Sequence, residues 1–112
     1  MLAAHYRLDH LIALLDHNQL QIDGDITQVL SPEPLSEKWR AFSWQVLEVN
    51  GHDTTALALA IKQAKASTGQ PTIIIAETVK GKGVSFMENQ AGWHGKAPSK
   101  EERILALKEL EG

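Results

Sequence analysis

Three short strand-like runs constrain what this chain can fold into more than any other feature. Each is five to eight residues long, and the last contains three consecutive isoleucines: Leu11–Leu15, Trp44–Val49 and Thr72–Val79. A short, mostly apolar run of this kind is typical of a parallel strand that is covered on both faces. Segments with helical spacing alternate with the three runs. The sequence therefore predicts a parallel α/β sheet with flanking helices.

Local signals mark where the predicted helices begin. Residues 35–42 form a short predicted helix after two prolines. Asp53 is a good N-cap because its carboxylate can accept a free backbone N–H of the first turn. Ser99 and Glu102 form a capping box at the start of the last predicted helix. The helix after Asp53 should present one apolar face, made of Ala56, Leu57, Ala60, Ile61 and Ala64.

The composition fits one small domain or part of a larger one, with 112 residues of which 43% are hydrophobic and 22% charged. The net charge of -3 gives no reason to expect nucleic acid as a partner. Cysteines are absent, which excludes disulfides and thiolate metal sites. We find neither a secretory signal nor an apolar stretch near the roughly 20 residues that span a bilayer. We therefore expect a cytoplasmic protein that does not contact a membrane.

Three strands are few for a parallel sheet. Both faces of such a sheet need cover, and each of its two edges carries unpaired backbone groups. The predicted architecture therefore requires more polypeptide, either upstream in the same protein or from a partner.

In open α/β sheets, ligands bind beyond the carboxyl ends of the strands. Three loops qualify by their position in the sequence: Asp16–Gly24, Asn50–Asp53 and Lys80–Gly95. In the first, the amide oxygen of Asn18 and the carbonyl two residues later are donors suited to Mg²⁺ or Ca²⁺. The structural alternative is a strand end in which Asn and Asp bond their own backbone.

The last loop brackets Lys82 with two glycines and carries His94 between a tryptophan and a glycine. Such glycines let backbone approach an anion. The histidine is a candidate proton donor or phosphate ligand. A surface turn with a locally satisfied histidine is the alternative, so each loop is a weak signal by itself.

In combination and order these segments resemble the N-terminal, thiamine diphosphate-binding part of transketolases, particularly the two-subunit form in which this part is a separate chain. The segments are Asp16–Gly24, Gly51–Asp53, Thr78–Asn89 and Trp93–Gly95, so the resemblance covers nearly all of the chain. It implies a partial three-layer α/β/α thiamine diphosphate-binding fold with about three parallel strands. Deoxyxylulose phosphate synthases and dehydrogenase E1 subunits share the asparagine, but residues 21–24 and 93–95 favour transketolase.

The resemblance also implies roles for single residues. Asn18 and the carbonyl of Leu20 would bind Mg²⁺ (or Ca²⁺ or Mn²⁺), and Ile22 would pack against thiamine diphosphate. His94 would lie near the diphosphate and the sugar, as a hydrogen-bond donor or proton carrier. The expected partners are a C-terminal transketolase subunit, a second copy of the thiamine diphosphate domain and sugar phosphates. The expected family reaction moves a two-carbon ketol unit between sugar phosphates, in the pentose phosphate pathway.

One departure from the family pattern concerns the metal. The motif opens with Gly-Asp-Gly, and the 17 residues before Asn18 do not contain it. By the resemblance, the metal-binding aspartate is therefore lacking. The glutamate that activates the cofactor's aminopyrimidine belongs, in the family, to another domain or subunit and is also absent. We expect residues 1–112 to form a single incomplete domain without its upstream half, and we expect the isolated chain not to turn over sugar phosphates. The alternatives are a non-catalytic remnant, a subunit piece that depends on a partner, and a small anion-binding module.

Overall fold

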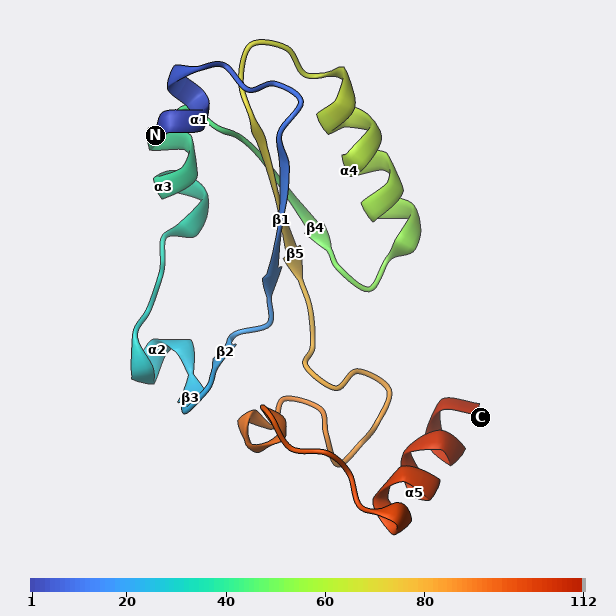
Figure 1. Cartoon of the computed structure of the whole chain (residues 1–112). Helices are drawn as coiled ribbons and strands as arrows, with labels where there is room; N and C mark the ends of the chain where they lie inside the picture. Colours follow the sequence, from blue (N-terminus) through green and yellow to red (C-terminus); the bar gives the residue numbers. More distant parts are fainter. Residues whose placement is uncertain (112) are drawn as a thin grey trace. The chain divides into compact units, whose positions relative to one another are not determined.

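A three-stranded parallel sheet is the centre of the first of two units in the computed structural model, which describes residues 1–111 (Figure 1). This unit comprises residues 1–17 and 32–78. Its elements are α1 (Leu2–His5), β1 (Ile12–His17), α3 (Leu35–Ala41), β4 (Gln45–Asn50), α4 (Thr54–Ala66) and β5 (Thr72–Glu77). The strand order is β1-β5-β4, so the isoleucine-rich strand is central.

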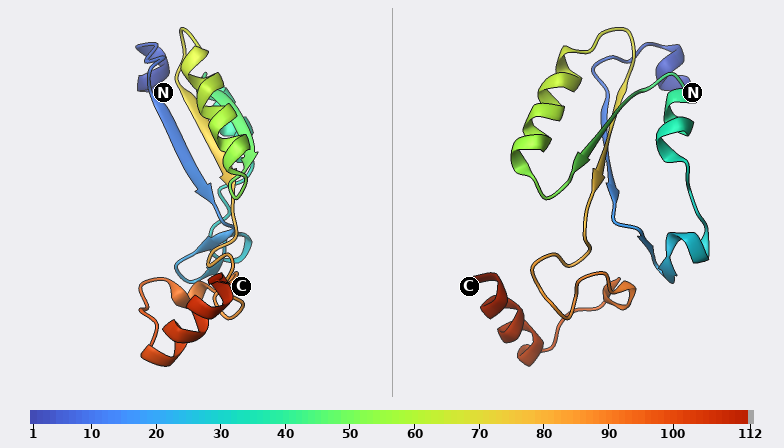
Figure 2. Two further views of the ribbon diagram at one scale, coloured as in Figure 1. Left: turned by 90° about the vertical axis from the view of Figure 1, so that its right-hand side faces the viewer. Right: turned by 180° about the vertical axis from the view of Figure 1, so that it is seen from behind.

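The two main helices of this unit lie on opposite faces of the sheet. Ile74 of β5 is fully buried and packs with Ala60 and Ala64 of α4, and Figure 2 shows α4 lying along the sheet. Glu48 of β4 points to the other face, where it accepts hydrogen bonds from Ser36 and Arg40 of α3. The predicted α/β/α layering with three parallel strands is thus confirmed.

The apolar face predicted for α4 is the face that packs, because Ala60, Ala64 and Ile61 contact the sheet. Its predicted N-cap is also confirmed, since the Asp53 carboxylate accepts the backbone N–H groups of Thr55 and Ala56. The sheet is less completely covered at β1. Leu14 pairs in register with Ile74, yet it is 60% exposed.

The second unit comprises residues 18–31 and the chain from Val79 onward. It contains the short antiparallel pair β2 (Leu20–Gln21) and β3 (Gly24–Asp25), then α2 (Ile26–Val29), the 3₁₀ turn η1 (Ala91–Trp93) and α5 (Lys100–Glu111). The expectation that residues 16–24 form a loop is therefore wrong in part, because β2 and the first residue of β3 lie within them. Short polar elements of this kind have no hydrophobic periodicity by which a sequence could reveal them.

The predicted capping box at α5 is present. The Ser99 N–H donates to the Glu102 carboxylate at 2.7 Å, and the Glu102 N–H donates to the Ser99 hydroxyl at 3.1 Å. The bond from Ser99 and the nearby Lys96 ammonium lower the pKa of Glu102 below its ordinary value. Among residues 1–111, no helix is long and apolar enough to cross a membrane.

Candidate functional site

The predicted site residues gather around one cavity of the second unit. Asn18, Leu20 and Ile22 come from the segment after β1 and from the β2–β3 hairpin, and His94 follows η1. The cavity has a volume of about 230 Å³ and is lined in full by Asn18, Leu20, Gln21, Ile22, Lys80, Ala91 and His94. Two stretches about 60 residues apart in the sequence therefore contribute to it.

Asn18 forms the local backbone hydrogen bond that is expected of a strand end in which Asn bonds its own backbone. Its amide oxygen accepts the backbone N–H of Leu20 at 3.0 Å, and Gln19 between them has a left-handed φ of 61°. Such a turn fixes the course of the backbone toward the hairpin. A carbonyl oxygen has two lone pairs, so the same oxygen retains the capacity to bind a second partner.

The hairpin presents Ile22 at its tip, where the residue is 64% exposed although it lines the cavity. Asp25 anchors the base of the hairpin by capping α2, because it accepts the N–H and the hydroxyl of Thr27. The bond from the Thr27 hydroxyl has the larger effect and the bond from the Thr27 N–H the smaller, and both lower the pKa of Asp25. An exposed isoleucine on a fixed hairpin is an apolar surface that a ligand ring can cover.

Lys80 is the charged lining residue that sequence reasoning missed. The sequence directed attention to Lys82 because two glycines bracket it, but the Lys82 ammonium lies 3.5 Å from the Glu88 carboxylate and does not line the cavity. Lys80 is half-buried and lines it. The signal that could have identified Lys80 is its position directly before Gly81, where the chain turns away.

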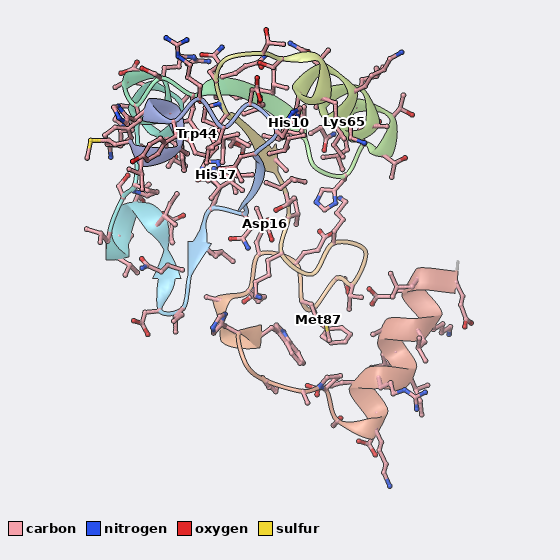
Figure 3. The ribbon with its side chains drawn as sticks, turned by 45° about the horizontal axis from the view of Figure 1, so that its top comes forward. His10, Asp16, His17, Trp44, Lys65 and Met87 are labelled. Atoms are coloured by element: carbon pink, nitrogen blue, oxygen red, sulfur yellow. The ribbon has the colours of Figure 1, made fainter. Side chains whose placement is uncertain are left out.

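Gly81 is required at that turn. Its φ is +71°, and a Cβ placed on it would lie 2.7 Å from both the Cβ and the carbonyl oxygen of Met87. Met87 is labelled on this loop in Figure 3. Any other residue would therefore clash with backbone as well as adopt an unfavourable conformation.

The donors around the cavity match parts of thiamine diphosphate and its metal. Lys80 and His94 offer N–H donors for a diphosphate, and Leu20 and Ile22 offer apolar surface for a ring. For a metal, the described residues offer the Asn18 amide oxygen and the Leu20 carbonyl, both uncharged. Mg²⁺ prefers six oxygen ligands with near-octahedral geometry. Residues 1–111 contain no cluster of three His, Cys, Asp or Glu side chains that could hold a metal, so the two donors fit only part of a metal site.

The carboxyl edge of the sheet in the first unit holds a separate polar cluster. His17, Glu77 and Asn50 share one row of the sheet at the ends of their strands, so all three strands end at one edge. The His17 ring contacts Glu77 through Nδ1 and Glu33 through Nε2, the second pair at 2.9 Å, and Thr78 donates to Asp16. Asp16 and His17 are labelled in Figure 3. Both lie within β1, whereas the sequence placed them in a loop.

A parallel α/β sheet together with strand-end loops that carry oxygen, imidazole and ammonium groups defines a cofactor-binding α/β domain. The particular family follows from sequence. The chain belongs to the transketolase family, because the family profile described as the transketolase thiamine diphosphate binding domain matches residues 1–112. The predicted family is thus confirmed.

Individual relatives agree with this assignment. The chain is 46% identical over 112 residues to a 6-deoxy-6-sulfo-D-fructose transketolase subunit from Clostridium sp. (strain MSTE9), covering 99% of this chain and 40% of that protein. It is 38% identical over 110 residues to an apulose-4-phosphate transketolase subunit from Phocaeicola vulgatus, covering 98% and 39%. It resembles the crystal structure of a transketolase from Campylobacter jejuni with a TM-score of 0.89 at 32% identity, covering 98% and 17%.

The chain spans about two fifths of the length of the two relatives named as subunits. The correspondence with the Campylobacter jejuni structure establishes the fold of nearly the whole chain, since 98% of it is covered.

Proposed function

We propose that this chain forms part of the thiamine diphosphate site of a transketolase, which moves a two-carbon ketol unit between sugar phosphates. The observation that carries the proposal is the convergence of Asn18, Ile22, Lys80 and His94 on one cavity. At about 230 Å³ this cavity is smaller than the roughly 300–1,000 Å³ of a typical complete ligand pocket. It therefore suits part of the cofactor, with the remainder held by protein outside these residues.

The diphosphate is the part that suits Lys80 and His94. A lysine ammonium is a compact point charge with three donors, and an imidazole N–H donates to a phosphate oxygen or carries a proton to the sugar. Leu20 and Ile22 would exclude water from the side of the cofactor against which they pack. Bound thiamine diphosphate would supply carbanion stabilisation, while this chain binds and orients.

The metal assignment of Asn18 and Leu20 remains part of the proposal. Both donors are neutral, so they would complete a Mg²⁺ site whose charge comes from elsewhere. We expect the isolated chain to bind Mg²⁺ weakly for this reason. Since a transketolase site needs groups absent from these residues, we also propose that the isolated chain has no ketol-transfer activity.

Several relatives are named as transketolase subunits. We propose by analogy that this chain assembles with a second copy of the thiamine diphosphate domain and with a C-terminal transketolase subunit. The substrates are proposed as sugar phosphates or sugars with a similar terminal anion, because the names of the relatives include a sulfo-sugar and a sugar phosphate.

Calorimetric titration of the chain with thiamine diphosphate, with and without Mg²⁺, tests the proposal. Lys80→Gln should weaken binding by about tenfold or more, because a hydrogen bond from a charged donor is worth about 1.5–3 kcal/mol. Lys82→Gln is the matched control, since that ammonium faces Glu88 and not the cavity. Equal losses in both variants would refute the assignment of Lys80. Absence of binding to the unmodified chain would refute the cofactor site.

A coupled assay for ketol transfer tests the proposal that the isolated chain has no such activity. The chain alone should give no turnover with pentose phosphates, and turnover by the purified chain would overturn the proposed need for further protein.

A further inference from the structure

We infer that Trp93 is a positioning residue that holds the His94 imidazole toward the cavity. The inference rests on the proposed function of His94 and deepens it. It starts from the observation that His94 is an exposed residue on a long loop, and yet its side chain lines a defined cavity. Such a residue keeps its place at the cavity more readily when the backbone that carries it is held.

The geometry of the 3₁₀ turn η1 separates the side chain of Trp93 from that of His94. Side chains three residues apart in a 3₁₀ turn lie above one another, and both Ala91 and His94 line the cavity. The turn is closed by a bond from the His94 N–H to the Ala91 carbonyl at 2.9 Å. Trp93 does not line the cavity and contacts Phe86 instead.

Three contacts hold the indole. Its Nε1–H donates to the carbonyl oxygen of Phe86 at 3.0 Å. The Phe86 ring lies 5.7 Å away, centroid to centroid, tilted by 55°. The Lys96 ammonium lies 4.0 Å from the centroid of the indole, within the range of a cation–π contact. The indole is thus tied to the chain on both sides of His94, at positions 86 and 96.

Because of this arrangement, the His94 side chain loses less conformational entropy when a ligand binds. A binding group already held in its bound orientation costs less entropy to engage. If the indole were released, the turn that carries His94 could rotate and the imidazole would sample solvent. Trp93 is therefore expected to act on ligand affinity through His94, with no contact of its own to the ligand.

Trp93→Phe removes the indole N–H while keeping an aromatic ring. Trp44→Phe is a matched control in the first unit, because the Trp44 Nε1 is buried and has no hydrogen-bond partner among residues 1–111. Both variants lose the same atoms, but only Trp93→Phe loses a hydrogen bond. Near-ultraviolet circular dichroism verifies that each variant is folded. If Trp93→Phe fails to fold, Phe86→Leu replaces it, since this change removes the ring contact and keeps the acceptor carbonyl.

The first test is a double-mutant cycle on the dissociation constant of thiamine diphosphate. Trp93→Phe should weaken binding by about twofold to fivefold, up to the worth of one hydrogen bond, and Trp44→Phe should not. In a His94→Gln background, Trp93→Phe should have no further effect. The same loss in both backgrounds would show that Trp93 does not act through His94 and would overturn the inference.

The second test needs no ligand. The ring C–H resonances of His94, assigned by their loss in His94→Gln, should shift in Trp93→Phe and stay unchanged in Trp44→Phe. An unchanged His94 spectrum in Trp93→Phe would refute the inference directly. If the unmodified chain binds no thiamine diphosphate but the His94 resonances do shift, the proposed function fails and the positioning role of Trp93 stands.

Discussion

Ile74 and Leu14 occupy the same row of the sheet, but truncating them should have very different costs. Ile74 is fully buried under α4, and Leu14 is 60% exposed. Ile74→Ala removes three carbon groups worth about 0.8 kcal/mol each, or about 2.4 kcal/mol of transfer free energy. The cavity left behind raises the expected loss of unfolding free energy to about 3–4 kcal/mol. Leu14→Ala removes the same number of groups, but with less than half of the side chain buried it should cost about 1 kcal/mol.

Urea unfolding followed by far-ultraviolet circular dichroism measures both losses. The midpoint should fall much further for Ile74→Ala than for Leu14→Ala, with similar slopes. Equal losses would refute the reasoning, because they would show that Leu14 is as well covered in solution as Ile74. Repeating the measurement at several protein concentrations then reveals whether a second copy provides that cover.

Three further predictions concern local features. Asn18→Asp keeps an oxygen that can accept the Leu20 N–H and adds a charge, so Mg²⁺ binding measured by calorimetry should tighten by about tenfold or more; unchanged binding would argue against Asn18 as a ligand. The pKa of Glu102 is lowered in the folded chain, so its stabilisation is present above its ordinary value of 4.5 and is lost as pH falls through the folded-state pKa. Glu102→Gln keeps a capping side chain but cannot titrate. Thermal unfolding should show that this variant loses less stability between pH 7 and pH 3 than the unmodified chain does. Gly81→Ala should destabilise by more than Gly69→Ala, because both have positive φ but only at Gly81 would an added Cβ have other atoms within 4 Å; equal midpoints in urea would contradict this.

The elements that sequence predicted well are those with local causes. The Asp53 cap and the Ser99–Glu102 capping box depend on residues two or three positions apart, so their geometry follows from the helix itself. The strand at residues 72–77 follows from its apolar run, because a short run of β-branched residues with three successive isoleucines is typical of a strand buried on both faces.

Other features could not be predicted because their partners are distant. The order β1-β5-β4 places the last strand between the first two, and nothing local encodes that choice. His17 lies in β1 and contacts Glu77, which is 60 residues away in the sequence. The hairpin and short helix after Asn18 are too brief and too polar to show a period.

The sequence by itself determined the family, the longer strands and helices, and the candidate site residues Asn18, Leu20, Ile22 and His94, because an ordered set of motifs and local apolar patterns runs along the chain. Only the tertiary structure decided that Lys80 and not Lys82 lines the cavity, and that Trp93 is tied to Phe86. The physical reason is that a side chain's direction depends on what packs against it, and those contacts come from the folded loop rather than from neighbouring residues alone.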